Sequence, residues 1–132
     1  MTKQRRRLLL GALCGILAAS VIVGLRISAA EDASAIETAK TWARLAPFPA
    51  TAHDLHVKIL GSMFTREFVI TFVVPPRDLA TWIQQSPGPA SAKQSTDGSE
   101  TVYEIVPGGG AGFSEIRVEP ETGKVSIKTN WS

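Results

Sequence analysis

The sequence is poor in the residues that most often carry chemistry in small proteins. It has one cysteine and two histidines among 132 residues. A single cysteine cannot form an internal disulfide, so the chain is not a disulfide-stabilised mini-protein. A Gly-x-Ser-x-Gly nucleophile motif and a Ser-x-x-Lys motif are also missing. These absences argue against several hydrolase classes and against thiol redox chemistry, and they leave side-chain packing as the source of stability.

Charge is also scarce, and it is unevenly distributed along the chain. Five of the 14 basic residues, Lys3, Arg5–Arg7 and Arg26, lie within the first 30 residues, which contain no acid. The rest of the chain therefore holds nine basic residues against all 12 acidic ones, a formal charge of −3. Because a mildly acidic body offers no basic stripe to a phosphate backbone, we expect no nucleic-acid binding.

The N-terminal segment is the clearest sequence feature. The basic residues Arg5–Arg7 precede an uncharged and mostly apolar run over residues 8–25. This order is typical of an export signal and predicts that the following residues lie outside the cytoplasm. Residues 1–30 are either a signal peptide cleaved near Ala30, after the small residues Ser28 and Ala29, or a single-pass anchor with a cytoplasmic N-terminus. The run of about 18 residues is longer than most signal cores and reaches the lower limit for crossing a bilayer.

Residues 31–132 are predicted to form one small extracytoplasmic domain. Apolar residues at helical spacing (Ile36, Ala39, Ala43 and Ala46) predict a helix over residues 33–46. Alternation predicts strands from residue 55 to 59 and from 68 to 74, and the second has apolar residues on both faces, as a central strand does. Residues 76–85, with Leu79, Trp82 and Ile83 on one side, predict a second, short helix.

The C-terminal third predicts three more strands, over residues 101–106, 113–119 and 124–131. Pro120 and Gly123 suit a hairpin turn between the last two, and Val125, Ile127, Thr129 and Trp131 share one face of the final strand. Residues 87–100 show no periodicity and are predicted to be a mobile loop. The whole pattern predicts an α+β fold of order α-β-β-α-β-β-β, a two-layer sandwich whose mainly antiparallel sheet of about five strands is covered by two helices. Trp42 and Trp82 are expected to belong to the core and to meet over the sheet.

Three groups of residues deserve a chemical interpretation. His53 and His56 could bind a metal on a helix, but on a strand residues three apart point to opposite faces, so no metal site is expected. The glycine-rich residues 107–112 precede a strand and lack a nearby lysine, which favours a flexible connection over a phosphate loop. The other interpretation is a loop kept small so that a ligand, a partner or neighbouring backbone can approach.

A carboxylate pair drawn from Glu67, Glu104, Glu115 and Glu119 is formally available for acid–base catalysis. Glu115, Arg117 and Glu119, however, alternate as on the solvated face of one strand. We therefore assign no catalytic, cofactor-binding or metal residue.

Two functional hypotheses follow from the sequence. The first is a non-enzymatic envelope domain, in contact with the membrane through residues 8–25 if these are not cleaved, that binds an envelope protein through an uncovered sheet face or an edge strand. The second is a small envelope hydrolase or glycan-active protein, with His56 and a nearby glutamate at a site between residues 87–100 and 107–112.

Overall fold

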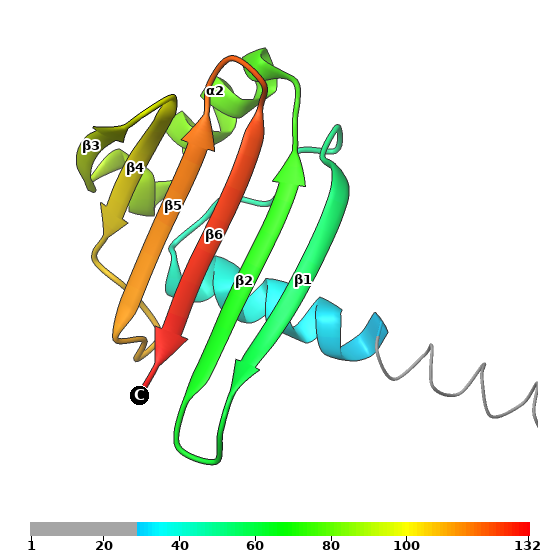
Figure 1. Ribbon diagram of the computed structural model, residues 1–132, viewed down its shortest axis with the longest axis vertical. Helices are drawn as coiled ribbons and strands as arrows, with labels where there is room; N and C mark the ends of the chain where they lie inside the picture. The colour runs from blue at the N-terminus through cyan, green and yellow to red at the C-terminus, as the bar shows by residue number, and fades with distance from the viewer. Residues whose placement is uncertain (1–28) are drawn as a thin grey trace, which may run out of the picture. The chain divides into compact units, whose positions relative to one another are not determined.

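The body of the protein is built on one antiparallel sheet. The computed structural model describes residues 29–132, and residues Ala35–Ser132 form one compact unit. Six strands pair in the order β1-β2-β6-β5-β4-β3 (Figure 1). They are β1 (His53–Gly61), β2 (Arg66–Val73), β3 (Lys93–Asp97), β4 (Glu100–Ile105), β5 (Phe113–Glu119) and β6 (Lys124–Trp131). The predicted export segment lies outside the described residues, and within them no helix is both long and apolar enough to cross a bilayer.

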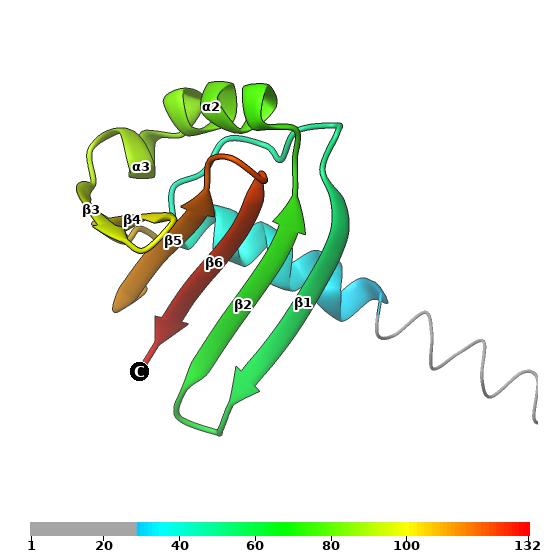
Figure 2. The same ribbon diagram turned by 45° about the horizontal axis from the view of Figure 1, so that its top comes forward.

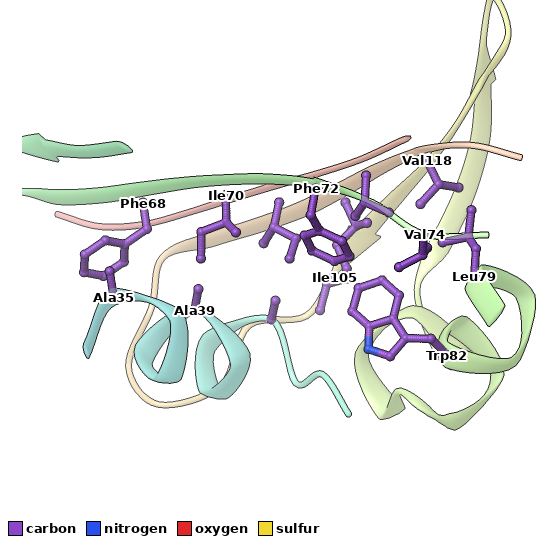
Figure 3. Close-up of a cluster of buried hydrophobic side chains, with 14 residues drawn as sticks. Ala35, Ala39, Phe68, Ile70, Phe72, Val74, Leu79, Trp82, Ile105 and Val118 are labelled. Atoms are coloured by element: carbon purple, nitrogen blue, oxygen red, sulfur yellow. The ribbon is translucent and has the colours of Figure 1, made fainter. Parts of the chain in front are cut away.

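Helices pack against one face of this sheet. Residues 29–42 are helical, and α2 (Pro76–Gln85) and α3 (Pro87–Ala90) follow β2. Figures 1 and 2 show residues 35–42 of the first helix crossing behind β6 and β2, and α2 near the end where β5 turns into β6. The largest fully buried side chains come from both layers and include Trp82, Phe72, Ile70, Ile116 and Ile127 (Figure 3). The predicted α+β class holds, but the described residues contain six strands and three helical segments rather than five and two.

The first helix ends earlier than its apolar spacing predicts. Ala35, Ala39 and Ala43 are buried, but the helix stops at residue 42 instead of 46. Arg44 takes a left-handed conformation with φ of 54°. The amide of Leu45 then reaches Lys40 O at 2.9 Å and the amide of Arg44 reaches Thr41 O at 3.3 Å, which together make a Schellman C-cap. Glycine usually occupies that position, so an arginine there gave no sequence signal for the end.

The prediction of a mobile loop over residues 87–100 was wrong, because this stretch contains α3 and β3. Every residue of β3 is exposed, so it has no apolar alternation, and its backbone pairs with β4 at the sheet edge. Asp97 pairs with Glu100 around the two-residue turn Gly98-Ser99, and Gly98 has φ of 60°. A glycine followed by serine between two strands is a recognised hairpin signal, here hidden by the polar composition around it.

The buried strands follow the sequence closely. β5 and β6 have the predicted bounds, and β2 lies between two neighbours as expected of a central strand. Val125, Ile127 and Thr129 are buried as predicted, whereas Trp131 is half-exposed. The aromatic ring contacts also differ from the expected Trp42–Trp82 pair: Trp42 stacks near Phe68 at 5.4 Å, and Trp82 packs on Phe72 and Phe48.

A buried polar relay fastens the sheet to the first helix. Ser114 Oγ donates to Trp42 O at 3.1 Å, and Thr129 Oγ1 donates to Phe113 O at 3.0 Å. The two hydroxyl oxygens lie 2.8 Å apart, so either hydroxyl can give its proton to the other instead. Because both hydroxyls are buried, each needs these partners, and the relay fixes where the helix end sits on the sheet.

Candidate binding surfaces

The sheet face opposite the helices carries alternate side chains of every strand and is called the bare face here. In Figure 1 the strands lie in front of the helices, so this face points toward the viewer. The cross-strand register places on it the following residues of the four central strands: Glu67, Val69, Thr71, Val73, Lys124, Ser126, Lys128, Asn130, Phe113, Glu115, Arg117, Glu119, Glu100, Val102 and Glu104. Most of them are half-buried or exposed.

A depression with a volume of about 410 Å³ lies on the bare face, toward the end where β5 turns into β6. Its floor contains Thr71, Val73 and Ser126, which are short side chains from β2 and β6. Longer side chains surround them, namely those of Asp54, His56, Glu100, Arg117, Glu119 and Lys124. The depression therefore combines a small, weakly polar floor with a rim that carries both signs of charge.

Arg117 is held in place at this rim. Its Nη1 lies 2.8 Å from Asp97 Oδ2 on β3, and its Nε lies 2.8 Å from Glu115 Oε1 on its own strand. These hydrogen bonds, first that to Asp97 and then that to Glu115, raise the pKa of Arg117 above its ordinary value. The three residues predicted to share a solvated face of β5 do share the bare face, but they are half-buried there, and the guanidinium links β5 to the edge strand.

Charge on the bare face is divided between its two halves. β1, β2 and β6 carry Lys58, Lys124 and Lys128 against the acids Asp54 and Glu67. β5, β4 and β3 carry five acids (Asp97, Glu100, Glu104, Glu115 and Glu119) against Lys93 and Arg117. A partner laid across this face meets a slightly basic half and an acidic half, which favours one orientation over the reverse.

The two histidines do not diverge as predicted. His53 pairs with Val73 and His56 with Thr71, so a bulge gives β1 one extra residue between them. Asp54 accommodates the bulge with φ of 53°. Both histidines therefore stand opposite residues of the bare face, and only His56 borders the depression. Within residues 29–132, no group of three or more His, Cys, Asp or Glu residues could hold a metal ion.

The two loops proposed to flank a hydrolase site meet at the end of the first helix. Gly108 N donates to Trp42 O at 2.9 Å, and Gly88 N donates to Arg44 O at 2.8 Å. A Cβ on Gly88 would lie 2.0 Å from Ala43 O, so this backbone approach requires glycine. Both loops thus supply donors to carbonyls at the helix end. Of the interpretations given to residues 107–112, close approach of neighbouring backbone is the one observed.

A second surface, which sequence reasoning missed, is apolar. Six of the seven large apolar side chains exposed among the described residues lie at one end of the sheet, here called the apolar end: Leu60, Met63, Phe64, Val106, Phe113 and Trp131. Leu60 and Phe113 share one cross-strand row through Glu67 and Asn130. The sequence feature that could have predicted this surface is the apolar pair Met63-Phe64, which lies in a turn, where polar residues are usual.

No protein-family model, curated protein or solved structure matches this chain. The roles of both surfaces are therefore argued from their own geometry.

Proposed function

We propose that the protein is a non-catalytic cell-envelope domain, held at the membrane by residues 8–25, that binds a protein partner through its bare face. The observation that carries the proposal is that helices cover only one face of a six-stranded sheet. The other face combines small floor residues such as Ser126 with a charged rim. A polypeptide that fills the depression can contact the floor and pair with groups on the rim.

The divided charge supports a protein partner in particular. A partner with a complementary pair of charged patches gains from both halves of the bare face, and a reversed partner meets like charges on each. Lys124 and Glu119 stand opposite each other in the β5–β6 register, at the boundary between the two halves. Reversing either charge therefore removes part of this complementarity.

The hydrolase alternative keeps one supporting observation, because His56 borders the same depression as Ser126, Glu100 and Glu119. General acid–base work needs a hydrogen-bonded arrangement of such groups. No hydrogen bond of residues 29–132 joins His56 to a hydroxyl or a carboxylate, and Nδ1 of His53 lies 3.1 Å from the backbone oxygen of Thr51. The geometry therefore favours binding over catalysis.

Site-specific photo-crosslinking in whole envelopes tests the proposal. A crosslinking residue at Ser126, on the floor of the depression, is expected to give one discrete protein adduct. Lys124→Glu is expected to lower the yield of that adduct, and added salt to lower it further. The matched control is Thr81 on the exposed side of α2, on the other side of the sheet. The same adducts from both positions, or none from Ser126, would contradict the proposal.

A further inference from the structure

The tip of the β1–β2 hairpin is the most exposed apolar part of the described chain. Met63 is 88% exposed and Phe64 is 75% exposed. Figure 1 shows this hairpin and the C-terminus at the same end of the sheet, away from α2. Leu60 and Trp131 add half-exposed surface beside the tip. Adjacent exposed apolar residues with further apolar surface beside them are typical of an interaction site.

The turn holds its apolar residues outward. Ser62 N donates to Thr65 O at 3.0 Å, and the hydroxyls of Ser62 and Thr65 lie 3.2 Å apart. Phe64 N donates to Ser62 Oγ at 3.2 Å. The polar groups of the turn thus satisfy one another, which leaves Met63 and Phe64 as the groups presented to a partner.

The residues beside the tip suit a membrane interface. Arg66 is exposed and stands opposite Trp131 in the β2–β6 register. Tryptophan favours the boundary between headgroups and hydrocarbon, and a guanidinium can pair with lipid phosphates. The apolar tip therefore suits the apolar side of this boundary, and Trp131 and Arg66 suit the headgroup side.

The chain length also keeps this end near a bilayer. The apolar run ends at Leu25 and the compact unit starts at Ala35, and residues 29–35 of this stretch are helical, so the nine residues between them span at most about 25 Å. Figure 3 shows Ala35 beside Phe68, and Phe68 lies two residues from the start of β2, where the hairpin emerges. The chain therefore enters the body in the half of the sheet that carries the apolar end.

We infer that the apolar end rests on a lipid bilayer, with Met63 and Phe64 inserted into its interfacial layer and Arg66 and Trp131 at the headgroups. This inference rests on the proposed anchor, because the anchor supplies the nearby bilayer. It adds a second contact that orients the body relative to the membrane surface, so that the sheet end meets lipid and the bare face stays accessible to a protein partner.

Depth-dependent quenching in the full-length chain tests this contact. In a Cys14→Ala background, Met63→Cys carries an environment-sensitive fluorophore, and the protein is reconstituted into vesicles of phosphatidylcholine and an anionic phospholipid. Glu121→Cys, in the exposed turn between β5 and β6 at the opposite end of the sheet, carries the same fluorophore as the matched control. Lipids brominated near the top of the acyl chain should quench the label at position 63 and not that at 121, because interfacial apolar elements reach about 5–10 Å into that layer.

Each other outcome overturns the inference in a distinct way. A chain that does not float with vesicles contradicts both the anchor and the tip contact. A chain that floats but shows equal quenching at 63 and 121 contradicts the tip contact alone. A label at 63 that neither the brominated lipids nor a water-soluble quencher reaches in the vesicles shows that a second copy or another part of the protein covers the tip, and this also overturns the inference.

Discussion

Tyr103 is the only tyrosine of the chain, so the titration of its phenol can be followed without interference from another tyrosine. It lies opposite Ile116 on the helix-covered side of the sheet and lines an apolar hollow of about 300 Å³ with Leu79, Ile83 and Val118. Burial raises the pKa of Tyr103 above its ordinary value of about 10. The folded state thus keeps its phenol proton at a pH where the unfolded chain has lost it.

The sign of the pH effect follows from this shift. The unfolded phenol ionises first, so stability from this group is complete below about pH 10 and is lost as the pH rises through the folded pKa. We expect the phenolate absorbance of the native protein to appear at higher pH than in concentrated denaturant. Equal midpoints in the two states would contradict the buried position of the ring, and Tyr103→Phe supplies the baseline without a phenol.

Gly88 tests the close approach between α3 and the end of the first helix. An added Cβ would lie 2.0 Å from Ala43 O and 3.0 Å from Ile105 Cγ2. Gly88→Ala is therefore expected to lower the free energy of unfolding by about 1–3 kcal/mol, the usual cost of overpacking. Urea unfolding of the full chain in mild detergent measures the change.

Gly112→Ala is the matched control, because nothing lies within 4 Å of a Cβ there and its φ is not positive. Its effect should stay within about 0.5 kcal/mol. Similar losses for the two variants would show that the contact between Gly88 and Ala43 does not determine the position of α3.

At the scale of elements, the Ser114–Thr129 relay joins β5 and β6 to the first helix. Thr129→Val removes a buried hydroxyl of nearly the same shape and leaves Ser114 and Phe113 O short of a partner. We expect a loss of about 1–3 kcal/mol in the free energy of unfolding, and a comparable loss for Ser114→Ala.

The double variant should lose less than the sum of the two single variants, because each single change leaves the other buried hydroxyl short of a partner and the double variant has neither hydroxyl. A double-mutant cycle by chemical unfolding measures this coupling. Strict additivity would mean that the two hydroxyls do not act together in the folded protein.

Some strands could be predicted from the sequence and others could not. β2, β5 and β6 were predictable because one face of each is buried, so side-chain burial imposes a period of two on the sequence. β3 was not, because backbone pairing alone holds this exposed edge strand. The bulge at Asp54 reversed the predicted divergence of the histidines, since one extra residue in a strand moves later side chains to the other face.

Neither surface was fully predictable. The alternation of Glu115, Arg117 and Glu119 indicated a solvated face, but the pairing of Arg117 with Asp97 depends on β3, which the sequence did not reveal. The apolar end depends on cross-strand rows that bring Leu60 and Phe113 to one end of the sheet. Such rows appear only once the strand order is known.

At the scale of the whole molecule, the two proposals assign different tasks to different parts of one sheet. The apolar end is proposed to contact lipid, and the bare face is proposed to bind a protein of complementary charge. This division requires the body to remain attached to residues 8–25, because cleavage near Ala30 would let it diffuse away from the bilayer. Retention of the N-terminal segment is therefore the central claim of this account.

The most direct test is the intact mass of the native protein, recovered separately from the membrane and soluble envelope fractions. We predict the full-length mass of 14.1 kDa, in the membrane fraction. A mass corresponding to residues 31–132, found in the soluble fraction, would contradict the anchored state and, with it, the proposed orientation of the body at the bilayer.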